Sequence, residues 1–192
     1  MTTSPLDVLA IGAHPDDIEL QVGGTLLLAR SQGLSVVMCH LTAGESGTRG
    51  NRESRRSEAQ AAAQELDCEM EILALPDGHV QVNTEGLETV VDLLRRRRPR
   101  LVLAPYVRDL HPDHEATGLL VQKAAFLAGL SRWGQTGQEP WRPDRVLYYS
   151  SHTDFEPRLV VDISAHIEQK KRAAQCYASQ FFREGATEPA TF

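Results

Sequence analysis

Two short segments of this 192-residue chain combine imidazole and carboxylate side chains at close spacing. The first is the run Ala-His-Pro-Asp-Asp at 13–17, and the second is the run His-Pro-Asp-His at 111–114. Histidine and aspartate are ligands that zinc and similar divalent ions accept, and three such ligands with one water make a catalytic metal site. Each run alone also fits helix-capping carboxylates or surface histidines. Together they predict a metal centre, provided that the fold brings the two runs side by side.

The elements that must position these runs follow from the alternation of apolar and amphipathic segments. We expect strands at 8–12, 35–41, 69–75, 101–104, 146–149 and 159–161. We expect helices at 23–30, 53–66, 87–98, 116–130 and 164–179, and an irregular end at 184–192. This alternation predicts one α/β domain over 1–192, with a Rossmann-like, mostly parallel sheet and helices on both faces, in three layers.

The order of the strands decides whether the two runs meet. In the common order 3-2-1-4-5, the first and fourth strands are neighbours at the point where the strand order reverses. Ligands of open α/β sheets bind outside the carboxyl ends of the strands at that point. The run 13–17 follows the first strand and the run 111–114 follows the fourth. The topology therefore predicts that both runs contribute to a single site.

Composition and charge narrow the class of protein. The chain has 20 lysine and arginine residues against 26 aspartate and glutamate residues, a formal net charge of −6, which argues against general affinity for nucleic acid. Its three cysteines form no Cys-x-x-Cys pair, as expected in a reducing compartment. The apolar run 8–13 is too short for a signal or membrane segment. We expect a cytoplasmic protein that acts on a small molecule.

The two runs resemble motifs of the PIG-L/LmbE family of metal-dependent N-acetylglucosamine deacetylases. The similarity extends from Asp7 to about Phe181 and includes the Thr-x-Gly-Glu loop at Thr42–Glu45. The chain most resembles the branch that deacetylates N-acetylglucosaminyl-malate in bacillithiol biosynthesis. This resemblance implies a zinc-dependent hydrolase of an N-acetylated amino sugar, with Fe²⁺, Mn²⁺ or Co²⁺ as alternative ions, and a homo-oligomer, by family resemblance a hexamer.

Carried over residue by residue, the resemblance assigns the metal to His14, Asp17 and His114. It makes Asp16 the general base and His111 the imidazole that steadies the tetrahedral intermediate. The chemistry agrees, because amide hydrolysis needs a polarised carbonyl, a deprotonated water and a protonated leaving amine. The side chains of neighbouring Asp16 and Asp17 diverge, so one can hold the metal while the other faces its water.

Further residues are assigned around this centre. Asp113 is expected to orient one of the imidazoles, or else to be a turn residue. The stretch 49–56 carries four arginines, which we expect to bind an anionic group of the substrate, unless they only form a solvated helix start. By resemblance, Arg55 contacts substrate, together with Arg49 and with Glu45 of the preceding loop.

Several alternatives remain open at this stage. The substrate could be of the diacetylchitobiose or mycothiol-precursor type, or the chain could be a Rossmann-like metal-binding protein without activity. A nucleotide-binding module fits poorly, because Asp16 and Asp17 stand where a glycine-rich loop would meet a pyrophosphate. The resemblance also implies that family members continue past the position of Phe192 with a segment that walls the substrate pocket, so part of that pocket is expected beyond it.

Overall fold

The computed structural model describes residues 4–134 and 137–181, so the irregular end expected at 184–192 lies outside the described residues. Five parallel strands form one sheet in the order β3-β2-β1-β4-β5, as the sequence predicts. The strands are β1 (Leu6–Gly12), β2 (Val36–His40), β3 (Glu69–Ile72), β4 (Pro99–Pro105) and β5 (Arg145–Tyr149). The ligand-bearing strands β1 and β4 are therefore direct neighbours.

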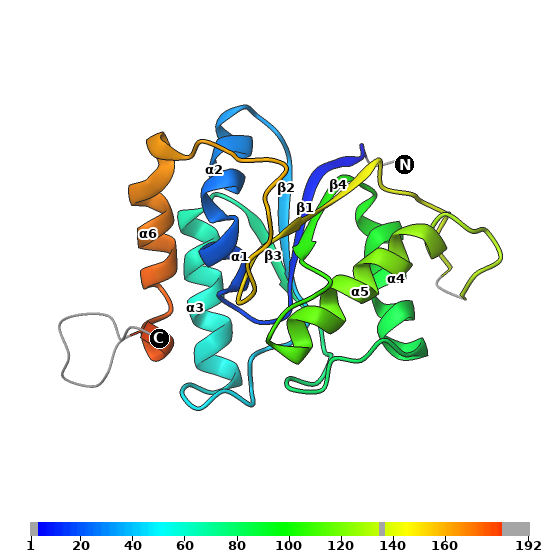
Figure 1. Ribbon diagram of the computed structural model, residues 1–192, viewed down its shortest axis with the longest axis horizontal. Coiled ribbons are helices and arrows are strands. Elements are labelled where there is room, and N and C mark those ends of the chain that lie inside the picture. The colour runs from blue at the N-terminus through cyan, green and yellow to red at the C-terminus, as the bar shows by residue number, and fades with distance from the viewer. Residues whose placement is uncertain (1–3, 135–136, 182–192) are drawn as a thin grey trace.

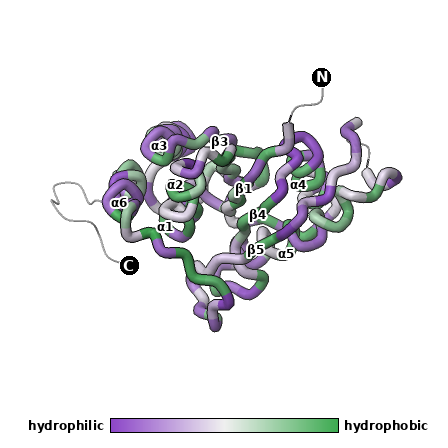
Figure 2. The backbone as a smooth tube through the Cα atoms, turned by 90° about the horizontal axis from the view of Figure 1, so that it is seen from above, coloured by the Kyte–Doolittle hydropathy of each residue, from purple (hydrophilic) through white to green (hydrophobic). Residues whose placement is uncertain are grey.

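Helices cover both faces of the sheet, which confirms the three-layer arrangement (Figure 1). The helices are α1 (Asp17–Gln21), α2 (Gly23–Ser31), α3 (Arg52–Glu65), α4 (Thr84–Arg97), α5 (Pro112–Leu127), α6 (Ile167–Gln175) and α7 (Ala178–Phe181). Figure 2 shows α1, α2, α3 and α6 on one side of the strands and α4 and α5 on the other. Across residues 4–134 and 137–181, no helix combines the length and the apolar character that crossing a bilayer requires.

The central strand β1 is buried on both faces, as parallel strands between two helix layers are. Leu9 and Ile11 pack toward α4 and α5, whereas Val8 and Ala10 pack toward α1 and α2. Helix α4 buries one stripe of its surface, as its apolar spacing predicts. Burying one leucine of this kind stabilises the fold by about 1.5–3 kcal/mol. These two cores fix the strand ends from which the site is built.

The predicted sixth strand at 159–161 is wrong. Leu159 and Val160 are 64% and 79% exposed, and within the described residues the sheet ends at β5. After β5 the chain leaves the sheet and runs to Ile163, which packs against Gly24 of α2. The segment therefore has the composition of a strand but no neighbouring strand to pair with.

Several element boundaries also differ from the sequence prediction. The helix expected at 164–179 is divided into a 3₁₀ turn at Ser164–His166, α6 and α7. Strand β3 ends at Ile72, although Leu75 still donates its backbone N–H to Leu41. The short helix α1 was not expected from the sequence.

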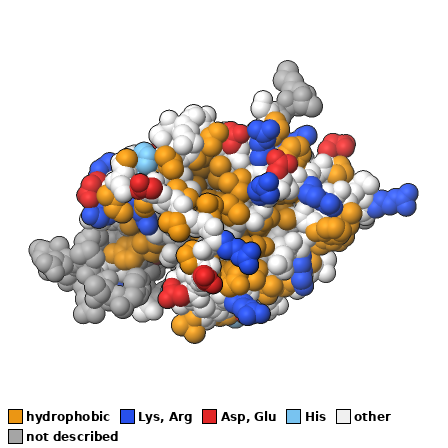
Figure 3. Space-filling model, turned by 45° about the horizontal axis from the view of Figure 1, so that its top comes forward, with side chains coloured by type: hydrophobic (Ala, Val, Ile, Leu, Met, Phe, Trp, Pro, Cys, Tyr) orange, Lys and Arg blue, Asp and Glu red, His pale blue; other side chains and the backbone are white. Residues whose placement is uncertain are grey.

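On the surface shown in Figure 3, basic and acidic side chains are interspersed and form no broad basic area.

Candidate active site

The loop after β1 and the start of α5 bring the two histidine-containing runs together. The ring of His14 lies 4.8 Å from that of His111 and 5.3 Å from that of His114, measured between centroids. The rings of His111 and His114 are 4.6 Å apart. Helix α5 begins directly at this point, with His111 as its N-cap and Pro112 as its first residue. The convergence expected from the strand order is thus present.

Asp17 lies between the two histidines to which the resemblance assigns the metal. Its Oδ2 is 3.5 Å from His14 Nδ1, and its Oδ1 is 3.1 Å from His114 Nε2. A tetrahedral ion with bonds of 2.0–2.1 Å separates its ligand atoms by about 3.3 Å. Within the described residues, three groups have donor atoms that all lie within 4.8 Å of one another: His14, His111 and His114; His14, Asp77 and Asp113; and Asp109, His114 and His152. The ligand set of His14, Asp17 and His114 stays a prediction.

Carboxylates face the opposite ring nitrogens of both histidines. His14 Nε2 lies 3.1 Å from Asp77 Oδ1 and 3.2 Å from Asp113 Oδ2. His114 Nδ1 lies 3.4 Å from Asp109 Oδ1. Metal-bound histidines usually donate their other ring N–H to such a carboxylate, which fixes the tautomer and the ring orientation. This arrangement leaves His14 Nδ1 and His114 Nε2 as the nitrogens that face Asp17.

The carboxylates around His14 are themselves held by backbone amides. Asp113 accepts hydrogen bonds from the N–H groups of Gly78 and Val80, at 2.7 and 3.2 Å. Although burial opposes it, hydrogen bonding from His14 and from these amides lowers the pKa of Asp113. Burial lowers the pKa of His14, but hydrogen bonds to Asp113, Asp17 and Asp77 outweigh it and raise that pKa to about 12. These contacts favour the protonated form of His14.

Sequence reasoning missed two of these carboxylates. Asp77 stands in Pro-Asp-Gly, a turn sequence that does not indicate a contact with a histidine. Asp109 precedes the second run by two positions, and this proximity was the available signal. The Asp109 carboxylate accepts the backbone N–H groups of His111 and His152, at 2.9 and 3.1 Å, so it joins the loops that follow β4 and β5.

Asp16 adopts a backbone conformation that is rare for a residue with a side chain. Its φ is 106° and its ψ is −29°, and its side chain makes no capping bond to α1 although it occupies the N-cap position. Such a conformation costs about 1–3 kcal/mol and persists only where the surroundings fix it. Asp16 is therefore not the simple capping carboxylate that was one interpretation of the sequence.

The surroundings of Asp16 suit a base. Its Oδ2 lies 3.3 Å from Arg55 Nη1, while the adjacent Asp17 turns toward the histidines. Burial and the Asp17 charge raise the pKa of Asp16 to about 7, and the Arg55 cation limits that rise. A general base is most effective when its pKa lies near the working pH. Asp16 is thus a carboxylate that can take up and release a proton under ordinary conditions.

His111 is half-buried at the edge of the cluster. Its Nδ1 accepts the backbone N–H of Asp113 at 3.2 Å, so the neutral ring carries its proton on Nε2. Burial and the neighbouring His14 and His114 lower the pKa of His111, which favours this neutral form. His111 can therefore donate a hydrogen bond from Nε2 to a substrate oxygen.

The arginines expected to bind substrate occupy different surroundings. Arg55 is only 4% exposed, and its guanidinium donates to the carbonyl of Pro15 and to Asp16. Arg52 is exposed and pairs with Glu45 at 3.1 Å, at the rim of the site. Arg49 is also exposed, and its carbonyl accepts a hydrogen bond from Gln180 at 2.8 Å. Arg55 therefore holds Asp16, and its contact with substrate stays a prediction.

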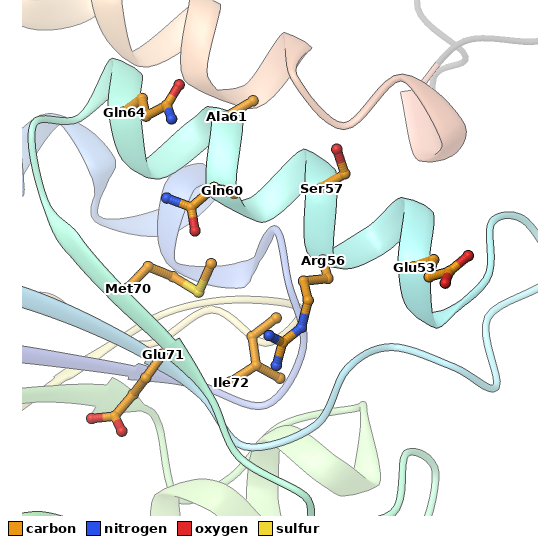
Figure 4. Close-up of a pocket in the computed structure, with 9 residues that line it drawn as sticks. All are labelled: Glu53, Arg56, Ser57, Gln60, Ala61, Gln64, Met70, Glu71 and Ile72. Carbon is orange, nitrogen blue, oxygen red and sulfur yellow. The ribbon is translucent and has the colours of Figure 1, made fainter.

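A groove of about 690 Å³ runs between α3 and the edge strand β3 and holds none of the clustered histidines (Figure 4). Its lining residues are Glu53, Arg56, Ser57, Gln60, Ala61, Gln64, Met70, Glu71 and Ile72. The adjacent arginines of α3 are thereby separated, because Arg55 reaches the loop after β1 whereas Arg56 lines this groove.

A comparison with known protein families shows to which family this chain belongs. The sequence profile described as PIG-L, GlcNAc-PI de-N-acetylase, matches residues 9–125, which contain both histidine runs. This chain belongs to the PIG-L family. The family assignment agrees with a site that combines a carboxylate and two histidines at the carboxyl ends of β1 and β4.

Relatives within the PIG-L family differ in the reactions for which they are named. Diacetylchitobiose deacetylase of Thermococcus kodakarensis is 33% identical over 91% of this chain and 70% of that protein. A probable N-acetyl-alpha-D-glucosaminyl L-malate deacetylase 2 of Bacillus anthracis is 29% identical over 91% and 81%. A 4-oxalmesaconate hydratase of Pseudomonas putida is 26% identical over 94% and 76%.

Among solved structures, a conserved protein from Thermus thermophilus is similar with a TM-score of 0.87 and 40% identity, over 92% of this chain and 80% of that one. The family and its deacetylase members make this chain a deacetylase of N-acetylglucosamine-containing substrates. The bacillithiol branch is not singled out, because the chitobiose deacetylase is more similar in sequence than the malate deacetylase.

Proposed function

We propose that this chain hydrolyses the N-acetyl group of an N-acetylglucosamine conjugate with a divalent ion held by His14, Asp17 and His114. The observation that carries the proposal is the position of Asp17 between the two histidines, with Asp16 turned away from them toward Arg55. We propose zinc as the ion, because two histidines and one carboxylate are typical of catalytic zinc. When bound, such an ion polarises the amide carbonyl and lowers the pKa of a bound water to about 7.

The residues of the chain handle the protons. The Asp16 carboxylate takes a proton from the water whose oxygen attacks the amide carbon. It later delivers that proton to the sugar nitrogen as the carbon–nitrogen bond breaks, which yields acetate and a free amine. His111 donates from Nε2 to the oxygen that becomes negative during the attack. Asp113, Asp77 and Asp109 keep the histidine rings in the required tautomers.

Two conjugates are candidates for the substrate. The exposed Arg49 and Arg52 at the rim favour an anionic partner such as N-acetylglucosaminyl-malate, and the Bacillus anthracis relative agrees with this. The ion pair between Arg52 and Glu45 reduces the positive charge available to an anionic substrate. The Thermococcus kodakarensis relative, at 33% identity, favours diacetylchitobiose instead. We propose the malate conjugate as the substrate and diacetylchitobiose as the alternative.

Release of free amine is the test of this proposal. Purified protein loaded with zinc is incubated with N-acetylglucosaminyl-malate, diacetylchitobiose and N-acetylglucosamine, and bound metal is measured on the same samples. We expect amine release from a conjugate, and its loss in Asp16→Asn with unchanged metal content. No amine from any of the three would overturn deacetylation, and consumption of 4-oxalmesaconate instead would assign the chain to the hydratase reaction of its Pseudomonas putida relative.

A further inference from the structure

Three polar side chains beneath the site take no part in the proposed reaction. Glu19 of α1, His40 at the end of β2 and Tyr177 between α6 and α7 are all fully buried. The hydroxyl of Tyr177 donates to Glu19 Oε1 at 2.5 Å, and His40 Nδ1 lies 2.9 Å from the carbonyl oxygen of His14. Burying such groups is unfavourable unless they are paired. Glu19 Oε2 and His40 Nε2 have no hydrogen-bond partner among the described residues, so the contacts of Glu19 Oε1 and His40 Nδ1 hold this arrangement.

Tyr177 connects this buried group to the general base through Arg55. The guanidinium carbon of Arg55 lies 5.7 Å from the centroid of the Tyr177 ring, within range of a cation–π interaction. The same guanidinium donates to Asp16 and to the carbonyl of Pro15. The contacts thus run without interruption from Glu19 through Tyr177 and Arg55 to Asp16.

The backbone of Asp16 needs this support. Its φ of 106° is a conformation that an aspartate leaves unless neighbouring groups hold it. Arg55 bonds the carbonyl on one side of that residue and the carboxylate of the residue itself. Arg55 in turn has little freedom, because its side chain packs directly against Gly44. A Cβ added to Gly44 would lie only 2.8 Å from Arg55 Nε. The ring of Tyr177 closes another side of the same guanidinium.

We propose that Tyr177, fixed by Glu19, is a positioning residue for Asp16 and acts through Arg55. The role of Asp16 as the base rests on the proposed function, whereas the chain of contacts does not. This inference extends the site to the junction of α6 and α7, 158 positions along the chain from Glu19. Its consequence is that changes at Tyr177 alter the rate of the chemical step and leave substrate and metal binding unchanged.

Substitutions at Tyr177 separate the ring from the hydroxyl. Tyr177→Leu removes the ring beneath Arg55, and we expect kcat to fall about 10- to 100-fold, the usual effect of a misplaced catalytic group. KM and bound metal should stay at the wild-type values. Tyr177→Phe keeps the ring, so its kcat should fall less than that of Tyr177→Leu.

Substitutions at Glu19 test whether this side chain fixes Tyr177. Glu19→Gln still accepts the Tyr177 hydroxyl, so its kcat should fall less than that of Glu19→Ala. Arg30→Ala, which removes the ion pair of Arg30 with Asp67 outside the site, is the control and should keep wild-type kcat.

Hydrogen–deuterium exchange of peptides covering 13–22 tests the same contacts without any substrate. We expect faster exchange in Tyr177→Leu and wild-type exchange in Arg30→Ala. Should wild type release no amine while Tyr177→Leu accelerates exchange, the positioning inference stands and the proposed function fails. Should Tyr177→Leu keep both kcat and exchange, or change KM and metal content as much as kcat, the inference is overturned.

If Tyr177→Leu does not fold, Arg55→Lys tests the same chain of contacts. Lysine keeps the positive charge but cannot bond the Pro15 carbonyl and the Asp16 carboxylate with one planar group. We expect the same signature, a lower kcat with unchanged KM and bound metal. Wild-type kcat in folded Arg55→Lys would overturn the inference.

Discussion

Metal binding to this chain is expected to release one proton from His14 per ion at pH 8, in addition to the proton lost by the metal-bound water. The proton comes from His14, whose pKa of about 12 without metal reflects the carboxylates of Asp113, Asp17 and Asp77 around its ring. A histidine must be neutral at the nitrogen that binds the ion. The ring keeps its proton on Nε2, which faces Asp77 and Asp113, and loses the one on Nδ1. Asp16, with a pKa of about 7, is already mostly ionised at pH 8.

The size of the effect follows from this one proton. Because protons compete with the ion for His14 Nδ1, the apparent metal affinity should rise with pH. The His14 proton alone corresponds to about a tenfold change in affinity, or about 1.4 kcal/mol, for each pH unit, and a proton lost by the metal-bound water adds to this slope above about pH 7. We expect this slope between pH 7.5 and 9, where the pH stays well below the pKa of His14.

Calorimetry in two buffers with different ionisation enthalpies measures the number of protons released, and competition with a chromophoric chelator measures the slope. Replacing both partners in Asp77→Asn/Asp113→Asn lowers the pKa of His14, so fewer protons should be released by that variant. No proton release from the wild type at pH 8 would refute the reasoning. Equal release from wild type and the double variant would show that these carboxylates do not control His14.

Three further changes test other parts of the site. Asp16→Asn should keep its metal and lose about 10²- to 10⁴-fold in kcat; loss of the metal would instead place Asp16 among the ligands. His114→Ala should abolish tight zinc binding in the chelator assay, and retention would show that the ligand set is wrong. Gly44→Ala places a methyl group 2.8 Å from Arg55 Nε at a φ of 68°, so both the melting temperature and kcat should fall. Gly33→Ala, with a φ of 81° and open space, is its matched control and should lower only the melting temperature; an equal loss of kcat would argue against the Arg55 contact.

The sheet and its order were predictable because local patterns and global topology agree. The spacing of Val90, Val91 and Leu94 marks the buried face of α4, and these residues are fully buried. The strand predicted at 159–161 failed because pairing depends on where the chain runs after β5, which composition does not encode. Helix α1 has only five residues, too few for a helical period to be visible.

At the site, the residues within the two runs could be found because their types and spacing are unusual. Asp77 could not, because Pro-Asp-Gly is a sufficient turn signal and its contact with His14 depends on the packing of a separate loop. Arg55 and Arg56 are adjacent in one basic stretch, and nothing in the sequence shows which of them faces Asp16. Only the rotation of α3 against the sheet separates the two.

The proposed metal ligands follow β1 and β4, in the loop after β1 and in the first turns of α1 and α5. These two strands pair along the middle of the sheet from Leu6 and Pro99 to Ala10 and Leu103. The loops that surround the ligands start from β2, β3 and β5, nearer its edges. Insertions and substitutions in these outer loops can therefore change which substrate is accepted, while the central strands β1 and β4 stay unaltered. This division accommodates family members named as a deacetylase and as a hydratase, each aligned with more than 90% of this chain. It also makes the loop after β5 a good starting point for laboratory evolution toward new acylated sugars.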